Sequence, residues 1–114
     1  LWKSDGTNAG TVMVKNINTY VNTGSSPMQL TVMGSTLYFS ADDGINRREL
    51  WKSDGTNAGT ILVRDIYVGN DSNPSSLTVM GTTLFFSATD YANGRELWKS
   101  DGTNAGTVLV KDIN

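Results

Sequence analysis

Short apolar runs alternate with polar, glycine-containing segments along this chain, and none of the runs has the 3.6-residue spacing of a helix. β-branched and aromatic residues dominate the runs, which is typical of strands. Glycine at positions 34 and 81 predicts tight hairpin turns, because glycine accepts the positive φ that two-residue turns need. The pattern therefore predicts four strands per repeat, at residues 30–33 and 77–80, 36–41 and 83–88, 49–53 and 96–100, and 60–65 and 107–112.

Two of the runs, 61–63 and 84–86, are apolar without a break. A strand with one exposed face should alternate apolar and polar residues, whereas a strand covered on both faces need not. These runs predict that the sheets stack on one another.

The chain is built from repeats, because LWKSDGTNAGT begins at Leu1 and returns at Leu50 and Leu97. We expect a half repeat over 1–17, which holds an outer strand pair, and full repeats over 18–66 and 67–114. The predicted fold class is all-β, with β-propeller-type four-stranded antiparallel blades in about two and a half repeats of 47–49 residues. A half repeat lacks an inner hairpin, so we expect either neighbouring repeats of a longer chain or self-association to complete it.

Composition and charge exclude several classes of function. The 114 residues include no cysteine and no histidine, so a Cys/His zinc site and a histidine-based triad are not possible. The nine Lys and Arg are scattered in a chain of net charge −2, which argues against nucleic-acid binding. No apolar run has the roughly 20 residues of a membrane span. The Thr, Ser, Asn and Gly content indicates an extracellular or cell-surface location.

The three tryptophans, Trp2, Trp51 and Trp98, are candidate ligand residues, because a ring of indoles could stack on sugars. The alternative is that each indole packs as a wedge between adjacent sheets. The neighbouring Ser-Asp-Gly-Thr segments favour a structural turn in which Asp and Thr cap backbone donors and Gly takes a left-handed conformation. The turn residues are Asp5, Gly6, Asp54, Gly55, Asp101 and Gly102.

The loop acids are candidate calcium ligands, because Ca²⁺ takes six to eight oxygens. Asp42, Asp43 and Asp90 are the candidates, with Glu49 and Glu96 beside them. Solvated loop acids are the alternative, since the spacing is not that of an EF-hand. The nearby arginines are expected to be loop cations, with Glu49 and Glu96 as candidate partners. No other cofactor is expected.

The segments 49–56 and 96–103, both beginning Glu-Leu-Trp-Lys-Ser-Asp-Gly-Thr, resemble the signature of the ELWxxDGT repeat family. The Gly106–Ile113 segment is similar to that family's continuation. The resemblance implies large secreted or surface-attached bacterial proteins with β-propeller-like repeats, and it implies no settled activity.

Together these features predict a non-catalytic extracellular repeat module with a structural or adhesive role, which self-assembles or belongs to a larger surface protein or filament. The alternative is a lectin-like propeller that binds glycans at sites repeated once per blade. No convergent acid and nucleophile indicates an enzyme.

Overall fold

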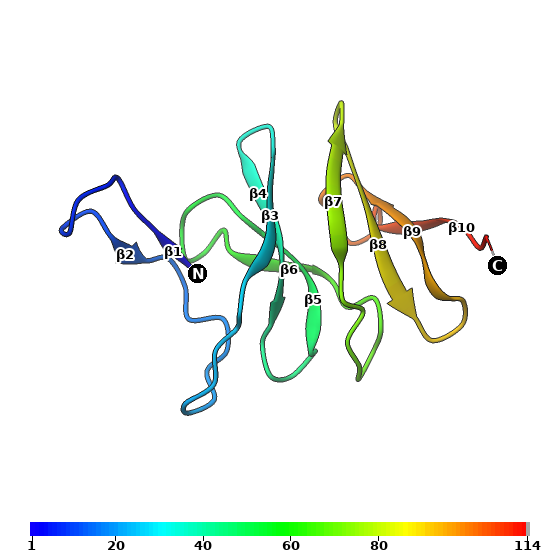
Figure 1. Ribbon diagram of the computed structural model, residues 1–114, viewed down its shortest axis with the longest axis horizontal. Helices are drawn as coiled ribbons and strands as arrows, with labels where there is room; N and C mark the ends of the chain where they lie inside the picture. The colour runs from blue at the N-terminus through cyan, green and yellow to red at the C-terminus, as the bar shows by residue number, and fades with distance from the viewer. Residues whose placement is uncertain (114) are drawn as a thin grey trace.

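The computed structural model describes residues 1–113, which form ten strands in three antiparallel sheets (Figure 1). The first sheet pairs β1 (Trp2–Lys3) with β2 (Val12–Met13). The second has the order β3 (Met28–Met33), β4 (Thr36–Asp42), β5 (Arg48–Ser53) and β6 (Ile61–Arg64). The third repeats this order with β7 (Ser75–Met80), β8 (Thr83–Asp90), β9 (Gly94–Ser100) and β10 (Val108–Lys111). The all-β prediction is confirmed, and the four strands per repeat form a meander.

The first strand of each full repeat begins two residues earlier than predicted, because it contains a β-bulge. The pairing of β3 with β4 shifts between Met28 and Thr31, and the pairing of β7 with β8 shifts between Ser75 and Thr78. A polar residue at positive φ lies in each bulge: Gln29 at 61° and Ser76 at 56°. An apolar pattern cannot reveal a bulge, since the extra residue interrupts the alternation.

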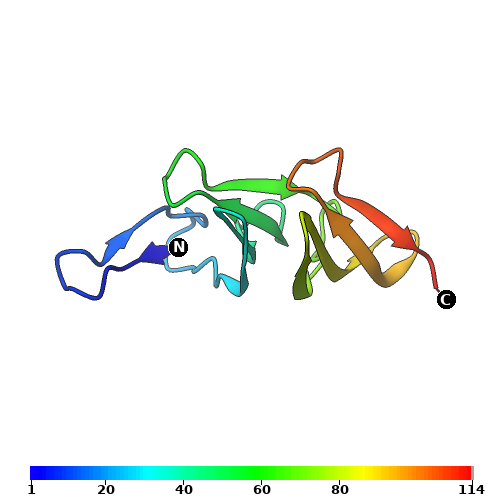
Figure 2. The same cartoon turned by 90° about the horizontal axis from the view of Figure 1, so that it is seen from above.

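The sheets follow one another along the longest axis of the molecule (Figure 2), and the second and third sheets approach each other at their first strands. β3 and β7 contact each other, as do β4 and β7. The glycine turns that join the first two strands lie at Gly34 and Gly81, with φ of 62° and 63°. Residues 1–113 form no closed ring, so stacked antiparallel sheets are shown and a complete propeller is not. No helix long and apolar enough to span a bilayer occurs in this part of the chain.

Burial differs between the two four-stranded sheets. In β4 the consecutive residues Tyr38, Phe39, Ser40 and Ala41 are all buried, because the middle sheet has a neighbour on each face. In β8 burial alternates, with Phe85 only half buried. The prediction that 84–86 is covered on both faces is therefore wrong for the described residues, and so is the same prediction for 61–63, where Ile61 is exposed. No described sheet covers the second face of β7–β10.

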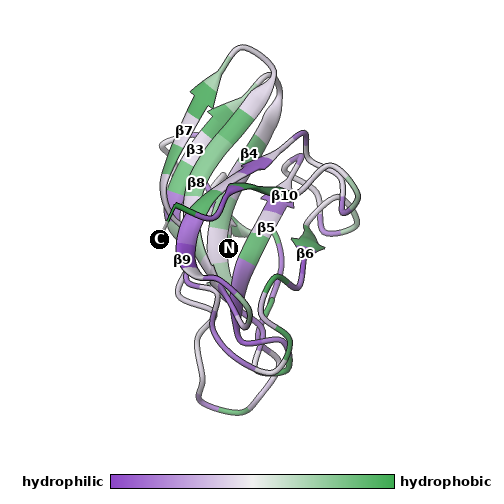
Figure 3. Ribbon diagram, turned by 90° about the vertical axis from the view of Figure 1, so that its right-hand side faces the viewer, coloured by the Kyte–Doolittle hydropathy of each residue, from purple (hydrophilic) through white to green (hydrophobic). Residues whose placement is uncertain are grey.

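Two hydrophobic clusters fill the junctions between sheets, and apolar segments accordingly lie along β3, β7 and β8 (Figure 3). The cluster between the second and third sheets contains Tyr38, Leu50, Val63, Ile66, Leu84, Phe86, Ala88 and Trp98. The cluster between the first and second sheets contains Ile17, Phe39, Ala41 and Trp51, with Leu1, Leu37 and Leu62 packed against it. The core of this chain is thus located between sheets, where it holds one repeat to the next.

Candidate functional site

The turn at residues 53–60 is held by its own side chains. The backbone N–H and the hydroxyl of Thr56 both donate to Oδ1 of Asp54, at 2.9 and 2.7 Å. The Thr56 hydroxyl in turn accepts the N–H of Gly59 at 2.9 Å. These donors lower the pKa of Asp54 below its ordinary value. The same bonds recur at Asp5 with Thr7 and at Asp101 with Thr103.

Each of these turns needs two glycines for different reasons. Gly55 has a φ of 90°, a region that residues with a side chain avoid, and Gly6 and Gly102 have φ of 91° and 94°. Gly59 needs room instead, because a Cβ there would collide with the carboxylate of Asp54. The Asp54 carboxylate thus accepts hydrogen bonds from its own turn.

The first and second sheets each bind the turn of the sheet that follows through a lysine. Lys3 Nζ donates to the carbonyl of Gly55 at 3.0 Å, and Lys52 Nζ donates to the carbonyl of Gly102 at 2.7 Å. A second cation at each junction does the same, and it lies just after β2 in the first sheet and on β6 in the second. Lys15 Nζ donates to the Thr60 carbonyl at 2.9 Å, and an Arg64 guanidinium nitrogen donates to the Thr107 carbonyl at 2.6 Å. The two junctions therefore share one set of polar contacts.

The tryptophans occupy equivalent positions with unequal exposure. Trp51 is 7% exposed and Trp98 is 5% exposed, each packed against the preceding sheet. Their faces are covered, so neither indole can stack on a sugar in this structure. Trp2 is 64% exposed. The ligand role considered for Trp51 and Trp98 does not fit their burial, and Trp2 alone has the exposure that it requires.

A buried carboxylate anchors the connection between repeats. Glu49 is fully buried, and its oxygens accept the N–H groups of Ile66, Tyr67 and Ser72 at 2.9, 3.3 and 3.2 Å. The Ser72 hydroxyl donates to the same carboxylate at 2.5 Å. Burial raises the pKa of Glu49 to about 7, although these hydrogen bonds act in the opposite direction. The Ser72 carbonyl then accepts the N–H of Thr89 on β8 at 2.8 Å. Glu49 thus connects the second sheet to the third.

The arginines have other partners than the expected glutamates. A guanidinium nitrogen of Arg48 donates to the Ser26 carbonyl at 2.9 Å, and one of Arg95 donates to the Asn73 carbonyl at 3.0 Å. Both arginines therefore hold the segment that enters the first strand of their own sheet. The carboxylate of Glu96 accepts the N–H of Ile113 at 3.1 Å, as Glu49 does for Ile66.

The candidate calcium ligands are engaged in their own loops. Oδ1 of Asp43 accepts the N–H of Asn46 and Oδ2 accepts its side-chain amide, at 2.6 and 2.7 Å. Asp90 binds Asn93 in the same two ways, at 2.6 and 2.8 Å. Asp42 accepts the N–H of Gly44 at 2.7 Å. Within residues 1–113, no three acidic side chains gather where they could hold a metal ion.

At each junction, cations of one sheet bind carbonyls in the turn of the next sheet. One outer face of the molecule has the equivalent cations, and the other has the equivalent carbonyls. On the third sheet, Lys99 and Lys111 are equivalent to Lys52 and Arg64, and no described residue accepts a hydrogen bond from either lysine. The apolar residues Leu97 and Val110 are also exposed on that sheet. We call this surface the rear face, defined by Leu97, Lys99, Val110 and Lys111.

At the other end, the turn at 4–11 has the same internal bonds as the later turns, yet its carbonyls receive no cation from a described residue. Trp2 and Met13, which are equivalent to Trp98 and Leu109, are exposed beside it. We call this surface the front face, defined by Trp2, Met13 and the 4–11 turn. Sequence reasoning considered Trp2 but missed the lysines, whose signal was their return at the repeat spacing.

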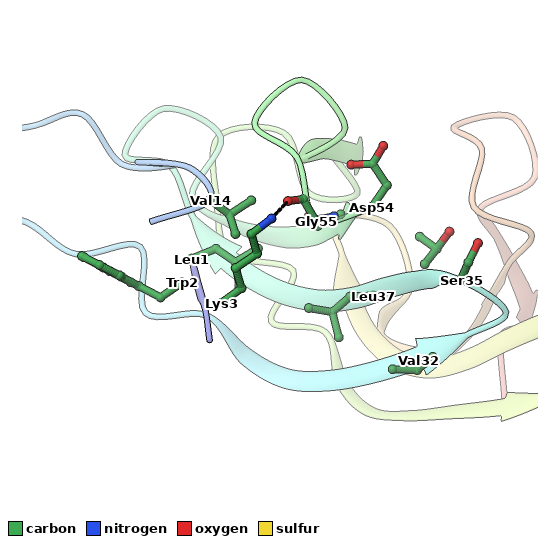
Figure 4. Close-up of a pocket in the computed structure, with 11 residues that line it drawn as sticks. Leu1, Trp2, Lys3, Val14, Val32, Ser35, Leu37, Asp54 and Gly55 are labelled. Atoms are coloured by element: carbon green, nitrogen blue, oxygen red, sulfur yellow. Dashed lines mark hydrogen bonds between the residues drawn. The ribbon is translucent and has the colours of Figure 1, made fainter. Parts of the chain in front are cut away.

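Three hollows lie near these elements. The first, of about 270 Å³, lies between the first and second sheets and is lined mainly by apolar side chains (Figure 4). The second, of about 480 Å³, is an open polar hollow that includes Tyr20, Asp42 and Arg47. The third, of about 300 Å³, is lined by Lys99 and Asp101 of the third sheet. The third repeat has Thr89 and Gly94 at the positions of Asp42 and Arg47, so the second hollow is not repeated once per blade.

Comparisons with known protein families, with curated proteins and with solved structures found no match to this chain. The resemblance to the ELWxxDGT repeat family therefore stays a prediction.

Proposed function

We propose that this chain is a non-catalytic structural module of an extracellular or cell-surface protein, and that it works by stacking its sheets against further repeats. Those repeats belong to other copies of the chain or to neighbouring parts of a longer one. The observation that carries the proposal is that the two junctions share one set of cation-to-carbonyl hydrogen bonds. The equivalent lysines on the rear face and the equivalent carbonyls on the front face have no such partner among the described residues. The β-propeller arrangement and the ELWxxDGT relationship are part of the same proposal.

Charge and shape support stacking between the two faces. The rear face has two ammonium groups, those of Lys99 and Lys111. The front face has the carbonyls of the 4–11 turn, whose equivalents in the two later turns accept such groups at both internal junctions. The exposed indole of Trp2 is equivalent to that of Trp98, which packs with Leu50 and Val63 of the sheet before it. The equivalents of those two residues are Leu97 and Val110 on the rear face. Stacking would bury Trp2 and Met13 of the front face and Leu97 and Val110 of the rear face, and burial of apolar surface drives association.

Contacts between unlike faces of identical copies produce rings or open filaments, depending on whether the rotation closes. A structural or adhesive role follows from either outcome, because both arrange many copies of the chain in one surface. We assign no catalytic residue. The Ser72 hydroxyl does donate to the Glu49 carboxylate, but both side chains are fully buried and hold the connection between repeats.

Sedimentation equilibrium over a wide concentration range tests the proposal. We expect the average mass to rise above that of the monomer as concentration increases. The Trp2→Ser variant removes an exposed aromatic from the front face and should weaken association at least tenfold. The Tyr91→Ser variant removes an even more exposed aromatic from a loop and should have no effect. A chain that stays monomeric throughout, or variants that behave alike, would overturn the stacking of one copy of the chain on another.

The second candidate function is glycan binding, and the open hollow beside Tyr20 is the observation that favours it. An exposed aromatic ring next to Asp42 and Arg47 provides a stacking surface and polar groups of both charges. We expect any such binding at this one hollow rather than at a tryptophan in every blade. A glycan array compared between the chain and Tyr20→Ala tests it, and signals that the variant retains would exclude the hollow.

A further inference from the structure

The hollow between the first and second sheets lies where the second and third sheets have a tyrosine. At the later junction the hydroxyl of Tyr38, on β4, lies directly against Gly102. At the earlier junction the equivalent glycine, Gly55, has no atom within 4 Å of the position that a Cβ would take. The difference arises because β4 continues the sheet beyond β5, whereas β1 has no described strand on its second edge.

The apolar side chains around this hollow are packed less completely than their equivalents at the later junction. Leu37 and Val32 lie on one side, and Leu1 and Val14 lie on the other (Figure 4). Their equivalents at the later junction, Leu84, Val79, Leu50 and Val63, all pack in the cluster that contains Tyr38. Val32 is 65% exposed while Val79 is half buried, and Leu37 is half buried while Leu84 is fully buried. The hollow therefore has apolar walls without the side chain that fills it elsewhere in the chain.

We propose that the hollow and the free edge of β1 together form an acceptor site for a β-hairpin of the kind that β3 and β4 make. The hairpin would add a strand to β1, which is β-augmentation, and would insert an aromatic side chain between Leu37 and Val14. The occupant is a hairpin whose second strand has the Tyr-Phe-Ser pattern of residues 38–40. This inference rests on the proposed stacking function and names the element that completes the first repeat.

The internal register predicts how the hairpin binds. Tyr38 pairs with Lys52 and Phe39 pairs with Trp51 in the β4–β5 ladder. Lys3 and Trp2 are equivalent to those two partners, so the incoming Tyr should lie opposite Lys3 and the incoming Phe opposite Trp2. The Tyr hydroxyl would then reach Gly55, whose carbonyl already accepts Lys3 Nζ at 3.0 Å, as Gly102 accepts Lys52 beside Tyr38. The added Phe would also cover part of the exposed indole of Trp2.

A synthetic peptide with the sequence of residues 27–42, titrated to millimolar concentration into isotope-labelled chain, tests the site by amide chemical shifts. We expect saturable shifts at Lys3, Leu37 and Gly55. A peptide with Ala in place of its Tyr should bind at least tenfold more weakly. Absent or scattered shifts, or equal binding of the two peptides, would overturn the proposal.

Variants of the chain provide a second readout. Val32→Trp narrows the hollow from an exposed position and should abolish the peptide shifts, whereas Ile45→Trp, also at an exposed position, should leave them unchanged. Equal peptide binding by both variants would contradict the site. Self-association without peptide binding would leave the stacking proposal intact and remove the hairpin site. Peptide binding by a chain that stays monomeric would support the hairpin site and overturn the stacking of copies.

Discussion

The hydroxyl of Tyr38 fills the space beside Gly102, and no side chain fills the space beside the equivalent Gly55. Both glycines have nearly the same backbone conformation, with φ of 94° and 90°. A matched pair of substitutions therefore separates the cost of that conformation from the cost of crowding at a junction.

We expect Gly102→Ala to destabilise the chain more than Gly55→Ala. Both variants carry the strain of a left-handed alanine, about 1–2 kcal/mol, and only the first adds a collision with Tyr38, about 1–3 kcal/mol. Urea unfolding of both variants measures the difference in the free energy of unfolding. Equal losses would contradict the described packing of Tyr38. In a Tyr38→Ala background, the losses from Gly102→Ala and Gly55→Ala should become nearly equal.

Arg47→Gly should stabilise the chain by about 1 kcal/mol, because Arg47 has a φ of 67° where the third repeat has Gly94 at 74°. The loop bonds of Asp43 with Asn46 match those of Asp90 with Asn93, so the two loops share one backbone path. Thermal unfolding checks the gain. Arg47→Ala serves as the control, and a gain from alanine as large as that from glycine would show that backbone strain is not the cause.

The buried carboxylate of Glu49 should make stability depend on pH in an unusual direction. Its pKa in the folded chain is raised to about 7 from an ordinary value of 4.5, so the folded state keeps a proton that the unfolded state releases between these values. The free energy of unfolding should therefore fall as pH rises from about 4.5 to about 7, by about 3 kcal/mol in total. Unfolding measured across this window checks the prediction.

Glu49→Gln isolates that effect from other titrating groups. The variant loses stability at low pH, because its amide cannot accept all four hydrogen bonds, but its remaining pH dependence between 4.5 and 7 should be nearly flat. If the chain and the variant have parallel pH profiles, Glu49 does not titrate in this window.

Trp98→Phe should cost much less than Trp98→Ala. The indole N–H of Trp98 is buried and has no hydrogen-bond partner in the part of the chain that the structure describes, so phenylalanine removes an unsatisfied donor while it keeps most of the packing. Alanine leaves a cavity at the junction and should cost about 3–5 kcal/mol. Guanidinium unfolding distinguishes the two. A loss of several kcal/mol in the phenylalanine variant would indicate a hidden partner of the indole N–H.

Short-range features were predictable from the sequence. The Asp54 turn follows from residues within a few positions of one another, as do the glycine hairpins and the four strands of each repeat. The contacts that hold repeats together were not predictable in the same way. Glu49 reaches Ile66 and Ser72 only because the connecting segment returns to the start of β5, and Lys52 reaches Gly102 only because two sheets stack.

The exposure of the tryptophans also depends on the stacking of whole sheets. Trp2, Trp51 and Trp98 are in identical local sequence, so no local pattern distinguishes the exposed indole from the buried ones. Position in the array decides it, because only Trp51 and Trp98 have a described sheet in front of them.

The central claim is that the rear face of one copy stacks on the front face of another, and crosslinking between copies tests it most directly. The chain contains no cysteine, so Lys111→Cys and Asn8→Cys can be introduced into separate copies and joined by a short bis-maleimide. Lys15 and Arg64 are equivalent to Lys111, and their Nζ and guanidinium nitrogen lie 3.4 Å from the carbonyl oxygens of Asn57 and Asn104, the equivalents of Asn8. A mixture of the two variants should therefore give a covalent heterodimer in high yield. A mixture of Lys111→Cys with Asn57→Cys, whose turn already binds Lys15, should give little. Equal crosslinking in the two mixtures, or none in either, would contradict the account.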